Sequence, residues 1–161
     1  MKYFLIVLTF LFNAASLRAQ TAEDSVKAAI NKMFAAMKNA DSEQLQSVFS
    51  DNMVLQTISK NKSGALTVLD EKPAEFIKQI AASAPGDLDE QIQFSTVLID
   101  GPLAFAWTPY SFFYKGKFSH CGVNSFQLVR FAEGWKIQYI IDTRRRKGCE
   151  NDGIKSQSEN K

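Results

Sequence analysis

The sequence predicts an α+β domain in which helices come first and a long sheet follows. Near the start of the chain, apolar residues recur at spacings of three and four, as they do in amphipathic helices. From Asp89 onwards, segments rich in β-branched and aromatic residues are separated by short turns. Because the two patterns occupy separate parts of the chain, they indicate an α+β fold rather than an alternating α/β one.

The first 20 residues have the layout of a secretory signal peptide. Lys2 is followed by a largely apolar run from Tyr3 to Phe12 and then by small and polar residues. The run is too short to span a membrane, which requires about 20 apolar residues. We therefore expect cleavage near Ala19 or Gln20, export to the periplasm or the medium, and no stable insertion of the mature protein into a membrane.

The mature chain has the size of one domain with a single hydrophobic core. We expect this domain to span residues 21–149, followed by a disordered polar tail over residues 150–161. The full chain has 19 basic and 17 acidic residues, and two of the basic ones, Lys2 and Arg18, lie in the leader. The mature chain is therefore neutral, which argues against a nucleic-acid partner.

Three segments in the first half of the mature chain have the pattern of helices. Residues 21–38 carry apolar side chains at helical spacing, and Thr21 with Asp24 forms a capping box at the start. Asp41 precedes a short second helix. Pro73 suits the first turn of a third helix, where its missing N–H would have no partner in the helix.

Six segments have the composition of strands. Their ranges are 52–59, 64–69, 90–99, 103–114, 117–131 and 135–144. The last four are separated by the short sequences DGP, KG and AEG, which suit hairpins. We therefore expect these four segments to form a meander of long antiparallel strands.

The order of these elements resembles the NTF2-like superfamily. The residues that carry the resemblance are the long first helix, the helix at Pro73, the closing Gly134-Trp135-Lys136-Ile137, and the half of the chain that contains "AWTPYSFFYKGKFSHCGVNSFQLVRF". This half is similar to exported bacterial members, including the SnoaL-like and lumazine-binding-like branches. The resemblance implies a cone in which N-terminal helices pack on a strongly curved antiparallel sheet and leave a pocket at the wide end. It implies no single activity, because one fold can serve many functions.

The two cysteines of the chain are predicted to form a disulfide. If paired residues of the last two strands sum to 266, Cys121 lies opposite Arg145. A turn at Gly148 would then bring Cys149 within bonding distance of Cys121. The alternatives are two free thiols or a reactive Cys121 activated by His120. The second alternative is disfavoured, because adjacent residues of a strand point to opposite faces.

The same register places four polar side chains on one face of the sheet, which are His120, Asn124, Asp142 and Arg144. The functional interpretation is a ligand site in which Asp142 accepts a proton, His120 relays it and Asn124 donates a hydrogen bond. The alternative is structural: Asp142 pairs with an arginine at the end of the sheet, and His120 is half exposed.

Two aromatic residues flank a proline in the strand predicted over residues 103–114. A proline inside a strand marks an edge or a bulge. A bulge at Pro109 would turn both Trp107 and Tyr110 toward the cavity, where they would suit a flat ring ligand. The alternative is that both residues pack in the core.

The favoured function is binding of a small, partly apolar ligand or of a protein partner, without chemistry. The alternative is an enzyme of the isomerase, cyclase or dehydratase type, with Asp142 and His120 as acid and base. A third possibility is a structural or interaction protein that forms a homodimer through the outer face of its sheet. We expect no cofactor and no metal, because one histidine and two paired cysteines do not supply a metal-binding set.

Overall fold

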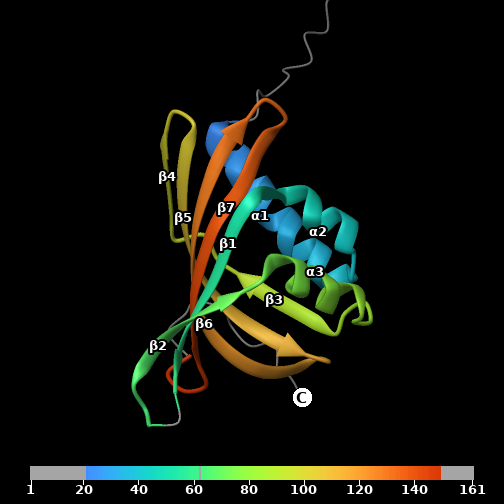
Figure 1. Ribbon diagram of the computed structural model, residues 1–161, viewed down its shortest axis with the longest axis vertical. Helices are drawn as coiled ribbons and strands as arrows, with labels where there is room; N and C mark the ends of the chain where they lie inside the picture. Colours follow the sequence, from blue (N-terminus) through green and yellow to red (C-terminus); the bar gives the residue numbers. More distant parts are fainter. Residues whose placement is uncertain (1–20, 62, 150–161) are drawn as a thin grey trace, which may run out of the picture.

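The computed structural model describes residues 21–61 and 63–149, and this part of the chain has three helices and a seven-stranded sheet (Figure 1). In chain order the elements are α1 (Ala22–Asn39), α2 (Ser42–Val48), β1 (Phe49–Lys60), β2 (Leu66–Glu71), α3 (Pro73–Ala81), β3 (Leu88–Ile92), β4 (Thr96–Asp100), β5 (Leu103–Tyr114), β6 (Lys117–Phe131) and β7 (Gly134–Arg145). The α+β prediction is confirmed. The predicted signal peptide and polar tail lie outside the described residues.

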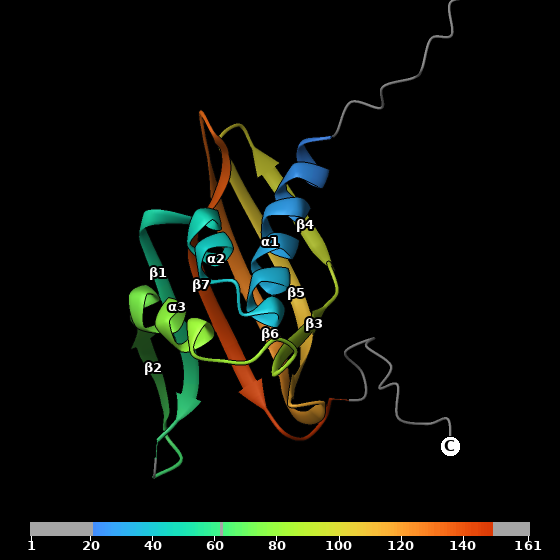
Figure 2. The same ribbon diagram turned by 90° about the vertical axis from the view of Figure 1, so that its right-hand side faces the viewer.

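All three helices lie on one face of the sheet, with α1 running along it and α2 and α3 beside one another (Figure 2). The helix α1 begins at the predicted capping box, in which the Thr21 hydroxyl accepts a hydrogen bond from the Asp24 N–H at 3.0 Å. Its buried face packs into the main core, where the Phe34 ring meets the Phe126 ring edge-on at 6.0 Å between centroids. None of the helices in the described part of the chain is long and apolar enough to cross a membrane.

The sheet is mixed, with the strand order β2-β1-β7-β6-β5-β3 and with β4 also paired to β5. Every neighbouring pair is antiparallel except β1 and β7, which are parallel. The expectation of a purely antiparallel sheet is therefore wrong for this pair. The long connection between β1 and β7 contains a helix and five strands, so it does not impose the antiparallel geometry that a hairpin does.

The segment predicted as one strand over residues 90–99 is two strands. Both pair with β5: β3 pairs with its second half and β4 with its first half. Pro109 lies opposite the break, and its carbonyl accepts a hydrogen bond from the Gln93 N–H at 3.0 Å. Because proline has no N–H to donate, a continuous ladder cannot form beside it. The proline thus marks a break in the neighbouring strand and not a bulge in its own.

The predicted register of β6 and β7 is correct at the end of the sheet that carries the candidate site. Asn124 lies opposite Asp142, and Cys121 lies opposite Arg145. Near the turn the prediction is wrong by one residue, because Phe131 pairs with Gly134. A bulge at Gln138, which has no partner in β6, restores the predicted pairing from Gln127 onwards.

Candidate functional site

A cavity of about 590 Å³ opens between α3 and the inner face of the sheet. This volume lies within the range of small-molecule sites, roughly 300–1,000 Å³. One part of its wall is apolar and is made by Met37, Phe76, Ile80, Leu88 and Phe112. The sheet contributes a polar part, made by Glu90, Tyr110, His120, Asp142 and Arg144.

Strand pairing explains why the polar residues come together. Asn124 pairs with Asp142 on one side and with Thr108 on the other, while Gly122 pairs with both Tyr110 and Arg144. The predicted grouping of His120, Asn124, Asp142 and Arg144 on one face is therefore confirmed. Of these four, Asn124 is buried behind the cavity wall and the other three line the cavity.

Gly122 provides the space that Tyr110 needs. A Cβ atom at Gly122 would lie 1.7 Å from the carbonyl oxygen of Thr143 and 2.7 Å from a ring carbon of Tyr110. In its absence the Tyr110 ring crosses the strand, and its hydroxyl lies 3.1 Å from Asp142 Oδ2 and 2.9 Å from the Thr143 carbonyl oxygen. The single hydroxyl proton is shared between these two acceptors.

Asp142 is almost completely buried, and only one of its two carboxylate oxygens has hydrogen-bond partners in the described structure. Its Oδ2 atom accepts a hydrogen bond from Arg144 Nε at 2.8 Å, and the other end of the guanidinium donates to Glu71 at 3.1 Å. The expected alternative, in which Asp142 pairs with an arginine, is thus present, yet Asp142 still lines the cavity. Its Oδ1 atom is buried and has no hydrogen-bond partner in the described structure.

Glu90 is a cavity residue that the sequence analysis missed. Burial raises the pKa of its carboxyl to about 7, although the hydrogen bond from Asn124 Nδ2, at 2.8 Å, opposes the rise. The nearby charge of Asp142 raises this pKa further. A signal was present in the sequence: Leu88, Glu90 and Ile92 alternate along one face of a strand, so Glu90 occupies a position otherwise taken by apolar residues.

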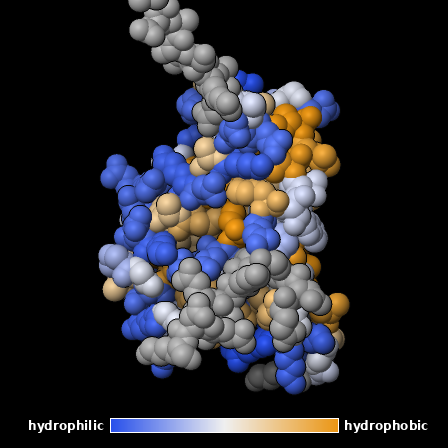
Figure 3. Space-filling view, turned by 180° about the vertical axis from the view of Figure 1, so that it is seen from behind, coloured by the Kyte–Doolittle hydropathy of each residue, from blue (hydrophilic) through white to orange (hydrophobic). Residues whose placement is uncertain are grey.

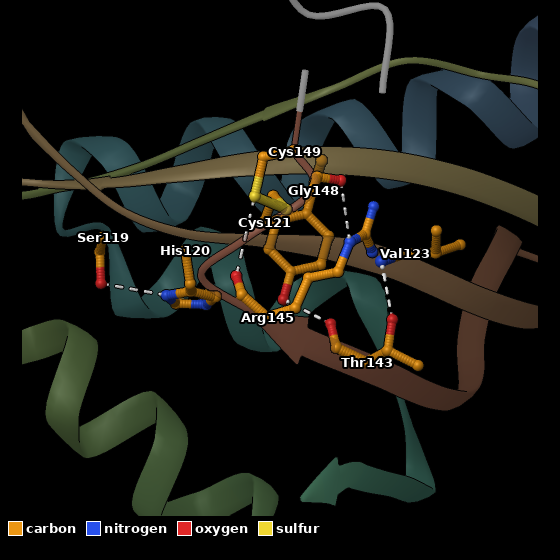
Figure 4. Close-up of a disulfide and its surroundings, with 9 residues drawn as sticks. Ser119, His120, Cys121, Val123, Thr143, Arg145, Gly148 and Cys149 are labelled. Carbon is orange, nitrogen blue, oxygen red and sulfur yellow. Dashed lines mark hydrogen bonds between the residues drawn. A yellow bond between two sulfur atoms is a disulfide. The ribbon is translucent and has the colours of Figure 1, made fainter. Parts of the chain in front are cut away.

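His120 is partly buried between aromatic rings. Its ring centroid lies 4.9 Å from that of Phe112 and 5.7 Å from that of Tyr110, and Nδ1 is 3.1 Å from the Ser119 hydroxyl (Figure 4). Burial lowers the pKa of this imidazole, and the positive charge of Arg144 lowers it further. The histidine is therefore neutral at pH 7.

Trp107 does not reach the cavity, and the prediction that it would is wrong. The pairing of β5 with β6 runs without a shift through Pro109, so strand alternation is preserved there. Trp107 and Tyr110 are three positions apart and consequently point to opposite faces. Trp107 is 43% exposed, whereas Tyr110 is 1% exposed.

The predicted disulfide between Cys121 and Cys149 is present, with the two Cα atoms 5.9 Å apart. Figure 4 shows it beside Arg145, with His120 and Ser119 lying to one side. Cys121 is fully buried and follows His120 directly in β6. The bond therefore attaches the segment after β7 to the strand that carries His120, next to the cavity.

The cavity carries more acidic than basic side chains. The acidic ones are Glu71, Glu75, Glu90 and Asp142, and the basic ones are Lys72 and Arg144. In residues 21–61 and 63–149, no group of three or more histidine, cysteine, aspartate or glutamate side chains is placed to hold a metal ion. Binding in the cavity therefore depends on hydrogen bonds, charge and apolar contact.

Solved structures share this architecture. A protein from Novosphingobium aromaticivorans described as NTF2-like with a cystatin-like fold is 13% identical, with a TM-score of 0.62 over 78% of this chain and 83% of that chain. The protein has the NTF2-like fold. A domain of unknown function from Nostoc punctiforme, described as cystatin-like, is 19% identical, with a TM-score of 0.60 over 78% of each chain.

A third NTF2-like structure, from Streptomyces avermitilis, is described as that of a proposed dehydratase. It is 18% identical, with a TM-score of 0.55 over 76% of this chain and 95% of that chain. No family model and no curated protein matches the sequence. At these identities the comparisons establish the NTF2-like fold, and the activity has to be argued from the site.

Proposed function

We propose that this NTF2-like domain binds a small, partly apolar ligand in the cavity beside α3. The observation that carries the proposal is the composition of the cavity wall, in which apolar side chains from α1, α3, β3 and β5 lie beside hydrogen-bonding groups of the sheet. Such a wall suits a ligand with an apolar body and a few polar atoms. Glu90 supports the same function, because it lines the cavity beside the apolar wall and its carboxyl group can form hydrogen bonds with a ligand.

Two tryptophan substitutions on α3 test this proposal. Gln79 and Lys78 are adjacent and exposed, but only Gln79 lines the cavity. A screen of small aromatic fragments by ligand-detected NMR should find binders of the wild-type protein. Gln79→Trp should weaken their affinity about tenfold or more by occupying the cavity, and Lys78→Trp should leave it unchanged. An absence of binders, or equal binding by both variants, contradicts the proposal.

A second candidate function is an acid–base enzyme of the isomerase, cyclase or dehydratase type. The observation that favours it is Glu90, whose pKa of about 7 suits a group that exchanges a proton near neutral pH. The roles expected from the sequence change accordingly. Asp142 is held by Arg144 and Tyr110, so Glu90 is the better candidate for the base, with the neutral His120 beside the same cavity.

Substitutions at two neighbouring positions of β3 test the catalytic candidate. Glu90→Gln keeps the shape of the side chain and the contact with Asn124, and it should lower turnover by roughly 10²–10⁴ if Glu90 transfers a proton. Asp89→Asn is the control, because Asp89 forms an ion pair with Lys38 outside the cavity. Conversion of cyclic ketones and hydroxylated rings, followed by mass spectrometry, provides the readout. Equal turnover by the wild type and Glu90→Gln contradicts a catalytic role.

The expectations of export and dimerisation are retained as proposals. The disulfide supports export, because such bonds persist in oxidising compartments. Exposed apolar residues of β4 and β5, namely Leu98, Leu103 and Trp107, support a contact through the outer face of the sheet. Hydrophobic surface gathers at this end of the sheet, at the upper right of Figure 3. In sedimentation experiments the wild type should behave as a dimer, and a Leu98→Lys variant should behave as a monomer.

A further inference from the structure

The ligand class can be narrowed by the charges that line the cavity. Its ionisable wall is dominated by carboxylates, and the basic residues are not available to balance an incoming anion. Arg144 is half exposed, and it donates to both Asp142 and Glu71. Lys72 is exposed at the start of α3. An anionic ligand would therefore approach several carboxylates without an uncompensated buried cation.

The carboxylates of the cavity wall instead favour a ligand that donates hydrogen bonds. The Asp142 side chain is 9% exposed, and its Oδ2 atom takes the hydrogen bonds from Arg144 and Tyr110. Its Oδ1 atom is buried and therefore closed to a ligand. Glu90 lines the same cavity and accepts a hydrogen bond from Asn124 at one of its oxygens. An ionised carboxylate only accepts hydrogen bonds, so an N–H or O–H group of a ligand suits Glu90, whereas a ligand that carries only acceptors does not.

Aromatic rings make up the rest of this region. Phe112 and Tyr110 flank His120 at the distances given above, and Phe76 faces them from α3. Such rings pack well against a flat apolar body, and their faces also attract cations. The surroundings therefore favour a positive group attached to a ring, and not a positive group alone.

We propose that the ligand is a small ring-containing amine, whose ammonium group donates to the Glu90 carboxylate beside Asp142 while its ring packs between Phe112 and Phe76. This inference rests on the proposed ligand-binding function and adds the chemical class. Charge-assisted hydrogen bonds to buried carboxylates are stronger than neutral ones. An amine should therefore bind more tightly than an alcohol or an acid of the same shape.

The pH dependence of amine binding follows from Glu90. Its pKa is about 7, so the second negative charge beside the amine appears as the pH rises through neutrality. The other ionisable groups of the cavity wall are Asp142, Arg144, Tyr110 and His120 on the sheet, and Glu71, Lys72 and Glu75 near the start of α3. His120 is neutral at pH 7 and loses any remaining charge as the pH rises. Because most of the His120 charge is lost below neutrality, the ionisation of Glu90 is the change that strengthens amine binding between pH 6 and pH 8.

A matched series of compounds tests the proposal by isothermal titration calorimetry. The series consists of tryptamine, tryptophol and indole-3-propionate, together with 2-phenylethylamine, 2-phenylethanol and 3-phenylpropionate. At pH 8, we expect each amine to bind about tenfold more tightly than its alcohol, and each acid to bind most weakly. Amine affinity should rise between pH 6 and pH 8 in the wild type.

Two variants assign the effect to the carboxylates. Glu90→Gln should lower amine affinity several-fold, remove the pH dependence and leave alcohol binding unchanged, and Asp89→Asn should resemble the wild type. If the alcohols or acids bind as tightly as the amines, the amine proposal is overturned while the ligand-binding function stands. If amine binding is unchanged in Glu90→Gln, the placement of the ammonium is wrong. If none of the six compounds binds, the amine proposal is overturned, and the fragment screen with Gln79→Trp and Lys78→Trp decides separately on the ligand-binding function.

Discussion

The inner face of β6 and β7 has two halves that differ sharply in chemistry. In one half, Phe126 pairs with Ile140, and both residues are buried in the main core. Two positions further along β6, Asn124 pairs with Asp142, and the cavity begins. The two pairs lie on the same strands and the same face, so strand geometry alone does not explain the difference.

The covering helices explain it. The 18-residue α1 buries six residues, whereas the nine-residue α3 buries only Ile80. Beneath α1 the sheet is therefore in close contact with side chains, which favours apolar residues. Beneath α3 a space remains, and polar groups there can interact with whatever enters it. The comparison shows that one sheet face is closed into core or left open as a cavity wall according to the helix that covers it.

The largest expected effect lies in the core half. Phe126→Ala should lower the free energy of unfolding by about 3–5 kcal/mol, because it removes a fully buried ring that contacts Phe34. Phe112→Ala, at the cavity, should cost less than half as much, because this ring is only partly buried and borders an existing space. Urea denaturation of both variants measures the difference, and equal losses would contradict the division into two halves.

The disulfide should contribute on the order of 3–4 kcal/mol by closing a loop with a sequence separation of 28 residues. We expect a variant carrying both Cys121→Ser and Cys149→Ser to lose about this much stability. The loss of hydrogen-exchange protection should be concentrated at the cavity end of β6 and β7, because the core half remains packed under α1. Uniform loss across both strands would show that the two halves do not unfold separately.

The pH dependence of the free energy of unfolding should reveal the ionisation of Glu90. In the unfolded chain the carboxyl ionises near pH 4.5, and in the folded protein near pH 7. Between these values the folded state retains a proton that the unfolded state has lost, so stability falls as the pH rises. The total fall should be at most about 3 kcal/mol. His120 titrates in both proteins, so its effect cancels when the free energy of unfolding of Glu90→Gln is subtracted from that of the wild type. A difference that does not change with pH would contradict the raised pKa of Glu90.

The smallest effect is expected on the outer face. Trp107→Ala should change stability by about 1 kcal/mol or less and leave ligand binding in the cavity unchanged, because the side chain is 43% exposed and points away from the cavity. Calorimetric titration of the wild type and the variant with the same compound provides the measurement. A marked loss of affinity would mean that a change on the outer face of the sheet alters binding in the cavity.

Much of the site could be predicted from local patterns. The alternation of β6 placed His120, Asn124 and Cys121 on their correct faces, and the expected pairing of Asn124 with Asp142 holds in the structure. Glu90 was not recognised, because a single acidic residue in a strand usually points to solvent, and only the neighbouring Asn124 and α3 reveal that it lies in the cavity wall. The placement of Trp107 failed because a break between β3 and β4 cannot be distinguished in sequence from a bulge in β5.

The sequence by itself determined the helix starts, the order of helices and strands, the faces of β6 and β7 and the expected pairing of the cysteines. These properties depend on contacts between near neighbours or on hairpins of fixed length, so they can be read from spacing. Only the tertiary structure decided the parallel pairing of β1 with β7, the space beneath α3, and the meeting of Glu90 with Asn124. These depend on how distant segments pack, and the burial that raises the pKa of Glu90 exists only once they have done so.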